Sequence, residues 1–157
     1  MLENIMFKII KDISDPLLVY IKDDPVRPEI PTEFRITGNR FVATLVEERP
    51  TAIVCVSLNN SVPTTVQELD GDCEAPDTAI FYTIWSYASG AAAKLLFDTV
   101  AAIQQTYPSV TRFVTLSPKT EMAYRFHMRN GASVLRENED TVNYEYFIPG
   151  RSHDQVC

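Results

Sequence analysis

Two kinds of side chain in this sequence are suited to moving protons during a reaction. His127 is the candidate general acid, because imidazole has a reference pKa of about 6.5 and exists in both forms near neutral pH. The acidic loop that ends at Glu74 and Asp77 offers a candidate general base. A purely structural histidine and a solvated loop are the alternatives, and both stay open. If the loop borders a cleft, its negative field favours a cationic amine.

A second stretch, Tyr87-Ala-Ser-Gly90-Ala-Ala92, is suited to binding an anion. A strand is predicted to end there and a helix to begin, and the small side chains would expose the first backbone N–H groups of that helix. These donors and the positive end of the helix dipole suit a pyrophosphate, and Ser89 is expected to cap the helix. A tightly packed helix start without any ligand explains the same residues.

The elements that must position these residues follow from hydrophobic patterning. Strands are predicted over residues 5–10, 40–46, 51–58, 80–87, 110–116, 132–136 and 142–148. Helices are predicted over residues 92–105 and 120–129, the second ended by Asn130-Gly131. Residues 16–21 fit a short helix or a strand, 24–31 an ordered connection, and 59–78 a polar loop. The strand-helix-strand order over 80–116 predicts a parallel strand pair.

Composition narrows the classes of function. The chain has 157 residues, 45% of them apolar, and a net charge of -7, which fits one soluble domain and disfavours nucleic acid. Three cysteines without CxxC spacing indicate a reducing, cytoplasmic setting, and no apolar run predicts a membrane helix. His127 and His153 lack metal-ligand spacing, so no metal is expected. We expect one domain over residues 1–149 and a flexible tail over 150–157.

The span from about residue 40 to 147 resembles the GCN5-related N-acetyltransferase (GNAT) family. The family's coenzyme A loop, Gln/Arg-x-x-Gly-x-Gly/Ala, is similar to Tyr87-Ala-Ser-Gly90-Ala-Ala92, with tyrosine at the Gln/Arg position. A second signature, Asn-x-x-Ala-x-x-Leu-Tyr-x-Lys-x-Gly-Phe, is similar to residues 120–132. Ala123, Phe126, Arg129 and Gly131 match it in register. Thr120 replaces the asparagine that contacts pantetheine, and His127 replaces the tyrosine that reprotonates the leaving thiolate. Residues 1–39 match nothing that we can name.

The resemblance implies a fold, a ligand and a reaction. The fold would be α/β (α+β), with a mixed, mostly antiparallel central sheet, helices on both faces and a splayed parallel strand pair. Acetyl-CoA or another acyl-CoA would bind where the two parallel strands splay apart. Its acyl group would pass to an amine on a small molecule or a protein. Both a monomer and a homodimer stay open. The implied binding residues are Ile84, Trp85, Ser86, Tyr87, Ala88, Ser89, Gly90, Ala91, Ala92, Thr120 and Ala123.

Two other functions remain open. Leu116-Ser117-Pro118, with the preceding helix, resembles a segment of malonyl-CoA decarboxylase, whose catalytic domain shares the acetyltransferase fold. That resemblance implies a decarboxylation role for Ser117; the enzyme also uses a histidine further along and has a larger helical domain that these residues do not include. Alternatively, because Tyr87, Thr120 and His127 differ from the family signatures, the chain is a non-catalytic binding or assembly module with the same fold.

Overall fold

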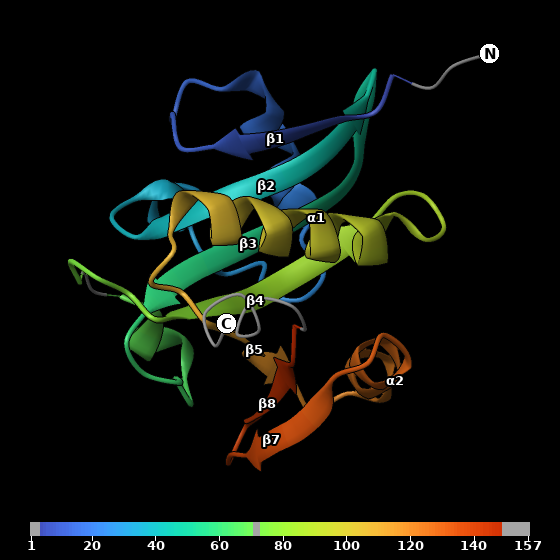
Figure 1. Cartoon of the computed structure of the whole chain (residues 1–157). Coiled ribbons are helices and arrows are strands. Elements are labelled where there is room, and N and C mark those ends of the chain that lie inside the picture. Colours follow the sequence, from blue (N-terminus) through green and yellow to red (C-terminus); the bar gives the residue numbers. More distant parts are fainter. Residues whose placement is uncertain (1–3, 71–72, 149–157) are drawn as a thin grey trace, which may run out of the picture.

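One eight-stranded mixed sheet forms the centre of the molecule, and the helices pack against it (Figure 1). This computed structural model describes residues 4–70 and 73–148. The strand order is β1-β2-β3-β4-β5-β8-β6, and β7 pairs with β8. The strands are β1 (Met6–Ile10), β2 (Arg40–Glu47), β3 (Arg49–Asn59), β4 (Thr78–Ser86), β5 (Arg112–Thr115), β6 (Ser117–Pro118), β7 (Ser133–Glu137) and β8 (Thr141–Tyr146). The helices are α1 (Ala91–Thr106) and α2 (Glu121–Arg129), with 3-10 helices η1 (Pro16–Asp23), η2 (Glu33–Ile36) and η3 (Val66–Leu69).

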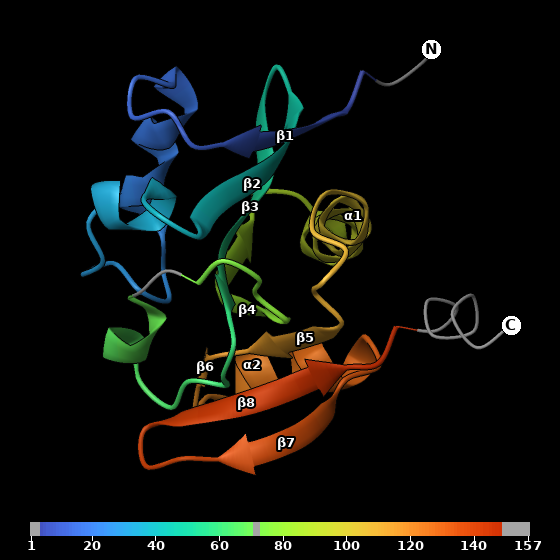
Figure 2. The ribbon, with the colours of Figure 1, turned by 60° about the vertical axis from the view of Figure 1, so that its left-hand side comes forward.

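Helices cover both faces of the sheet. On one face, Leu95, Leu96 and Val100 of α1 pack against alternate residues of β2, β3 and β4. On the other face, Leu18 and Ile21 of η1 pack against the opposite set of strand side chains. Figure 2 shows α1 on one side of the sheet and the N-terminal 3-10 helices on the other. The predicted fold class is therefore confirmed.

The parallel pair forms a fork that opens toward the end of β4. The paired positions of β4 and β5 run from Thr78↔Arg112 to Phe81↔Thr115, and the N–H of Leu116 donates to the carbonyl of Phe81 at 3.0 Å. Tyr82 then bulges, because Cys55 pairs with Thr83 while Val56 pairs with Phe81. A bulge increases local twist and bends the strand, so β4 leaves β5 at Tyr82. The predicted splay is confirmed, and the edge of β4 beyond Tyr82 is not paired with β5.

The local predictions need three corrections. The strand predicted over 110–116 is shorter, since β5 runs from Arg112 to Thr115, and a separate strand, β6, begins at Ser117; both pair with β8. The turn between the strands predicted over 40–46 and 51–58 is shorter than the four residues left between them, because β2 and β3 are separated only by Glu48, with a φ of 68°. Two short helices were not predicted: η2 follows the connection predicted over 24–31, and η3 lies within the loop predicted over 59–78.

Some predictions fall outside the described residues or remain open. The flexible tail predicted over 150–157, with His153, is not described. Residues 16–21, left open between helix and strand, lie within η1. Within the described ranges, no helix has the length and apolarity of a membrane span, and no three His, Cys, Asp or Glu side chains gather as a metal site would need.

Candidate functional site: a cavity at the strand fork

A cavity of about 320 Å³ opens at the fork. Its wall comes from the free edge of β4, the start of α1, the β5–β6 junction, α2 and the turn at Pro25 and Val26. The predicted site residues that line it are Ile84, Trp85, Ser86, Ala92, Ser117, Thr120, Ala123 and His127. The structure thus brings together both motif regions, which are far apart in sequence.

The remaining predicted residues lie outside this lining. Tyr87, Ala88, Ser89, Gly90 and Ala91 form the loop between Ser86 and Ala92, which do line it. Glu74 precedes Thr78, the first residue of β4, whereas the cavity is lined by the other end of that strand. The structure therefore does not bring the acidic loop at Glu74 to the cavity.

The loop before α1 has the backbone shape that an anion site requires, with one correction. Gly90 is the N-cap of α1, with a left-handed φ of 80° that favours glycine, and no side chain caps the helix. The expected cap by Ser89 is therefore wrong, because Ser89 lies one residue before the cap position. The N–H of Ala91 donates to the carbonyl of Ala88 at 3.2 Å, so the next N–H groups of the first turn, those of Ala92 and Ala93, are the donors that α1 offers to a ligand.

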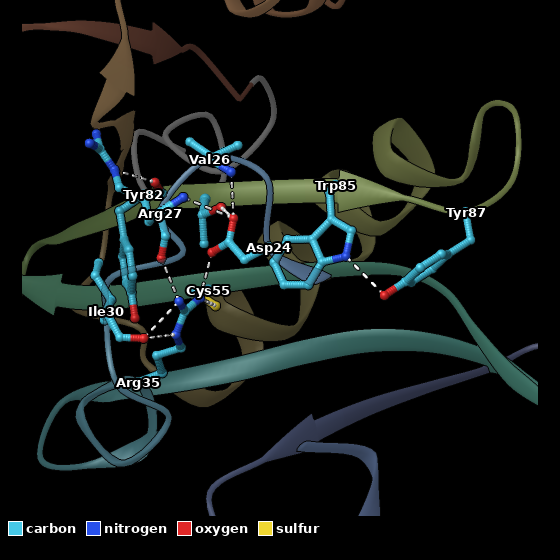
Figure 3. Close-up of polar contacts among 10 residues, drawn as sticks. Asp24, Val26, Arg27, Ile30, Arg35, Cys55, Tyr82, Trp85 and Tyr87 are labelled. Carbon is cyan, nitrogen blue, oxygen red and sulfur yellow. Dashed lines mark hydrogen bonds and ion pairs between the residues drawn. The ribbon is translucent and has the colours of Figure 1, made fainter. Parts of the chain in front are cut away.

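The Tyr87 hydroxyl forms hydrogen bonds within the protein, to Trp85 and Asp23. Its hydroxyl accepts a hydrogen bond from Trp85 Nε1 at 3.1 Å and donates to a carboxylate oxygen of Asp23 at 2.8 Å. Figure 3 shows the Trp85–Tyr87 pair beside the fork residues. Burial, followed by Asp23, raises the pKa of Tyr87. The tyrosine at the family's Gln/Arg position thus ties the loop to η1.

Ser117, His127 and Tyr146 form a buried hydrogen-bonded row. Ser117 Oγ lies 3.2 Å from His127 Nε2, and the Tyr146 hydroxyl lies 2.7 Å from His127 Nδ1. The imidazole also stacks on the ring of Tyr144, with centroids 4.9 Å apart. Residue spacing alone could not show this contact, which requires the β5–β6 turn and the position of α2 against β8.

Burial keeps the row uncharged. It lowers the pKa of His127 from its ordinary 6.5 to about 4 and raises that of Tyr146. The expectation that His127 exists in both forms near neutrality is therefore wrong. The neutral phenol can donate to Nδ1, which leaves Nε2–H to donate to Ser117 Oγ and frees the serine hydroxyl hydrogen for Thr115 Oγ1, 2.8 Å away, or for a ligand.

Part of the cavity wall comes from a segment for which the sequence predicted no site. Pro25 and Val26 line it, and Asp24 Oδ1 accepts the N–H groups of Val26 and Arg27 at 2.7 and 3.0 Å. The same oxygen accepts from Thr83 Oγ1 of β4 at 2.8 Å. Figure 3 shows this turn against β4. The sequence signal was an Asp-Pro turn, which predicts local structure but not its long-range contact.

A buried ion pair holds that turn in place. Arg35 Nη1 lies 2.6 Å from Asp24 Oδ2, and both side chains are fully buried. Arg35 also donates to the carbonyls of Ile30 and Arg27. These bonds satisfy the charge inside the protein and fix residues 24–30 in one conformation.

No protein-family model and no curated protein sequence matches this chain. Its fold does match solved structures. Malonyl-CoA decarboxylase from Agrobacterium vitis has a TM-score of 0.78 and 17% identity, over 97% of this chain and 62% of that one. The chain thus spans about three-fifths of that decarboxylase.

Acetyltransferase structures match over nearly their whole length. The GNAT domain of S. lividans PAT has a TM-score of 0.65 and 14% identity, over 90% of this chain and 89% of that one. NAA60 of Arabidopsis thaliana, in complex with a bisubstrate analogue, has a TM-score of 0.61 and 17% identity, over 94% and 99%. Both resemblances noted in the sequence are confirmed in the structure. This chain has the GCN5-related N-acetyltransferase fold, which malonyl-CoA decarboxylase shares.

Proposed function

We propose that this chain binds an acyl-CoA in the cavity and acts on the acyl group through Ser117 and His127. The observation that carries the proposal is the Ser117–His127–Tyr146 row, which presents a serine hydroxyl at the wall of the cavity. The free edge of β4 offers backbone groups to pantetheine, as a sheet edge does to an added strand. The loop at Gly90 offers backbone donors to the pyrophosphate.

The reaction that fits this row best is decarboxylation of a β-carboxyacyl thioester, of which malonyl-CoA is the simplest. The bond between the α carbon and the carboxylate carbon breaks, CO2 leaves, and the electron pair enters an enolate whose charge rests on the thioester oxygen. Ser117, supported by His127 Nε2–H, donates a hydrogen bond to that oxygen. The α carbon then takes a proton from water, which gives the acetyl thioester, and the hydroxide left behind combines with CO2 to form bicarbonate.

The lining of the cavity favours this reaction over acyl transfer to an amine. Among the described lining residues there is no Asp, Glu, Lys or Arg, and His127 is neutral. Removal of a carboxylate from water favours its loss as CO2, whereas an ammonium acceptor needs a base before it can attack. The likeness to malonyl-CoA decarboxylases and the resemblance at Leu116-Ser117-Pro118 support the same reaction.

Acetyl transfer from acetyl-CoA to an amine is the second candidate. It is favoured by the likeness to acetyltransferases, one of which was solved with acetyl-CoA. In that reaction, the amine attacks the thioester carbonyl, the carbon–sulfur bond breaks, and the thiolate takes a proton. The base would have to be a water chain, since the acidic loop at Glu74 lies away from the cavity.

The test compares both reactions in one protein. Purified protein is incubated with malonyl-CoA, or with acetyl-CoA and a panel of amines, and mass spectrometry follows acetyl-CoA, free coenzyme A and acylated amine. We expect acetyl-CoA from malonyl-CoA, and a fall in rate of about 100-fold or more in Ser117→Ala. Ser57→Ala is the matched control, because Ser57 is also buried but donates to Leu69 O, outside the cavity lining.

Each outcome separates the candidates. Acylated amine without decarboxylation would favour the acetyltransferase, and calorimetric binding of acetyl-CoA without either reaction would favour a binding module. The absence of any acyl-CoA binding would overturn the proposal.

A further inference from the structure

We propose that Arg27 is a positioning residue that braces the fork and sets the distance between the acyl group and Ser117. This inference rests on the proposed function, because it needs an acyl thioester in the cavity. It concerns a side chain from the N-terminal segment, outside the span that resembles the acetyltransferase family.

Arg27 joins two strands where they cease to pair. Its Nε donates to the carbonyl of Tyr82 at 3.3 Å, and its Nη2 donates to the carbonyl of Leu116 at 3.0 Å. Tyr82 is the bulged residue of β4, and Leu116 lies between β5 and β6. Two carbonyls that would otherwise lose their ladder partners are thus bonded to one planar group, which fixes the width of the fork.

The brace acts directly on the candidate catalytic serine. Leu116 is bonded covalently to Ser117, and its N–H is held by Phe81 O at 3.0 Å. With its carbonyl held by Arg27, Leu116 is fixed by hydrogen bonds of both its backbone groups, one to β4 and one to the N-terminal segment. The hydroxyl of Ser117 therefore keeps a defined distance from the free edge of β4, where the thioester would lie.

Arg27 is itself held rigidly by the buried network. Its N–H donates to Asp24 Oδ1 at 3.0 Å, and its carbonyl accepts from Arg35 Nη2 at 2.7 Å. Because Asp24 also binds Thr83 of β4, the brace and the strand share one anchor. Figure 3 shows Arg27 extending from this cluster, above Asp24 and Arg35.

A role limited to stability explains this arrangement less well. Burial lowers the pKa of Arg27, and the negative charges of Glu29 and Asp24 only partly oppose this effect; within the described residues neither lies at ion-pair distance from its guanidinium. A partly buried cation bonded only to neutral carbonyls is costly to keep. A role in holding the two diverging strands explains why the protein keeps this buried charge, because only the planar guanidinium bonds both carbonyls at once.

The brace should affect the acyl group and leave the coenzyme untouched. Pyrophosphate and pantetheine would lie along the Gly90 loop and the outer edge of β4, whereas the acyl group would lie at the fork beside Arg27. A loosened fork should therefore weaken acyl-CoA binding and catalysis but not the binding of free coenzyme A. A general loss of stability would affect both ligands alike.

The experiment uses Arg27→Met and Arg27→Lys in the full chain. We expect the Kd of coenzyme A to change less than about twofold, while the Kd of acetyl-CoA rises about tenfold, equivalent to 1.4 kcal/mol. We expect kcat on malonyl-CoA to fall about 100-fold in Arg27→Met, as a misplacement of about 1 Å can cost. Lysine cannot span both carbonyls in one plane, so Arg27→Lys should recover only part of this loss.

Arg112→Met is the matched control. Arg112 also ties two strands together, through a two-bond pair with Glu145 at 2.9 Å, but it lies at the other end of β5. We expect it to leave kcat and both Kd values unchanged. Circular dichroism checks that each variant is folded, and Arg27→Lys keeps the test informative if Arg27→Met does not fold.

The outcomes distinguish this inference from the proposed function. If wild type binds and converts the thioester but both Arg27 variants behave like Arg112→Met, the brace is wrong and the function stands. If both Arg27 variants lose coenzyme A and acetyl-CoA binding in equal proportion, Arg27 is only structural. If wild type binds no acyl-CoA, the proposed function fails first.

Discussion

At the scale of single residues, His127 defines how this site can work. Its two ring nitrogens are engaged by Ser117 and Tyr146, and burial leaves it neutral at physiological pH. A neutral imidazole between two hydroxyls can orient both of them through hydrogen bonds. It carries no positive charge, so it does not act as a protonated acid. Catalysis by this row therefore depends on hydrogen-bond direction more than on charge.

The lowered pKa of His127 predicts a pH dependence of stability. The unfolded chain binds the imidazole proton below about pH 6.5, whereas the folded chain does not until about pH 4, so stability rises with pH in that window. As the pH falls from 6.5 toward 4, wild type should lose about 3 kcal/mol relative to His127→Gln, which has no such group. Urea unfolding of both proteins at pH 7 and pH 4.5 measures this. Parallel losses in the two proteins would contradict the assignment.

The sequence could identify several site residues but not their contacts. Ser117 and His127 are visible as chemical groups, yet their contact depends on the chain leaving β5 at Leu116. Glu74 was a candidate base because a carboxylate loop precedes β4, but the strand places it at the opposite end from the cavity. Arg27 gave no motif, because two backbone carbonyls are its partners.

At the scale of elements, the start of α1 is defined by backbone shape. Gly90 has a positive φ, and so does Gly131 after α2. An added Cβ would meet no atom within 4 Å at either position, so substitution changes only the backbone preference. The two glycines therefore form a matched pair, of which one lies beside the proposed pyrophosphate site.

Gly90→Ala and Gly131→Ala should each reduce the free energy of unfolding by about 1–2 kcal/mol, the cost of a left-handed conformation with a side chain. Only Gly90→Ala should also weaken acetyl-CoA binding, by about tenfold. Calorimetric titration of both variants tests this. Equal affinity in the two would place the pyrophosphate elsewhere.

The sequence predicted the elements well where patterning is regular. Runs rich in β-branched and aromatic residues located β2, β3 and β4, and helical spacing located α1. The two-residue strand β6 was missed because Ser117-Pro118 has no strand pattern of its own, and only its pairing with β8 defines it. The fork in turn depends on the bulge at Tyr82, and no local pattern marks that residue.

At the scale of the whole molecule, the Asp24–Arg35 pair fixes the N-terminal segment, and Asp24 joins that segment to the sheet by accepting from Thr83 of β4. Both partners are fully buried, so removal of one leaves an uncompensated charge inside the protein. Arg35→Met should therefore reduce the free energy of unfolding by about 3–5 kcal/mol.

The exposed pair of Arg125 and Glu121 on α2 is the control for this loss. Both side chains are largely in water, so Arg125→Met should change the free energy of unfolding by about 0.5 kcal/mol or less. Urea denaturation measures both variants. Similar losses in the two would show that the buried pair does not anchor the segment.

The two hydrogen bonds of Arg27 also carry a consequence for how the protein is made. They join residues 55 and 89 positions apart in the chain, to Tyr82 and Leu116. During synthesis, which proceeds from the N-terminus, Arg27 leaves the ribosome long before either carbonyl exists. The fork can therefore be completed only after β5 has emerged, so the reactive end of the cavity should be among the later parts of the nascent chain to assemble.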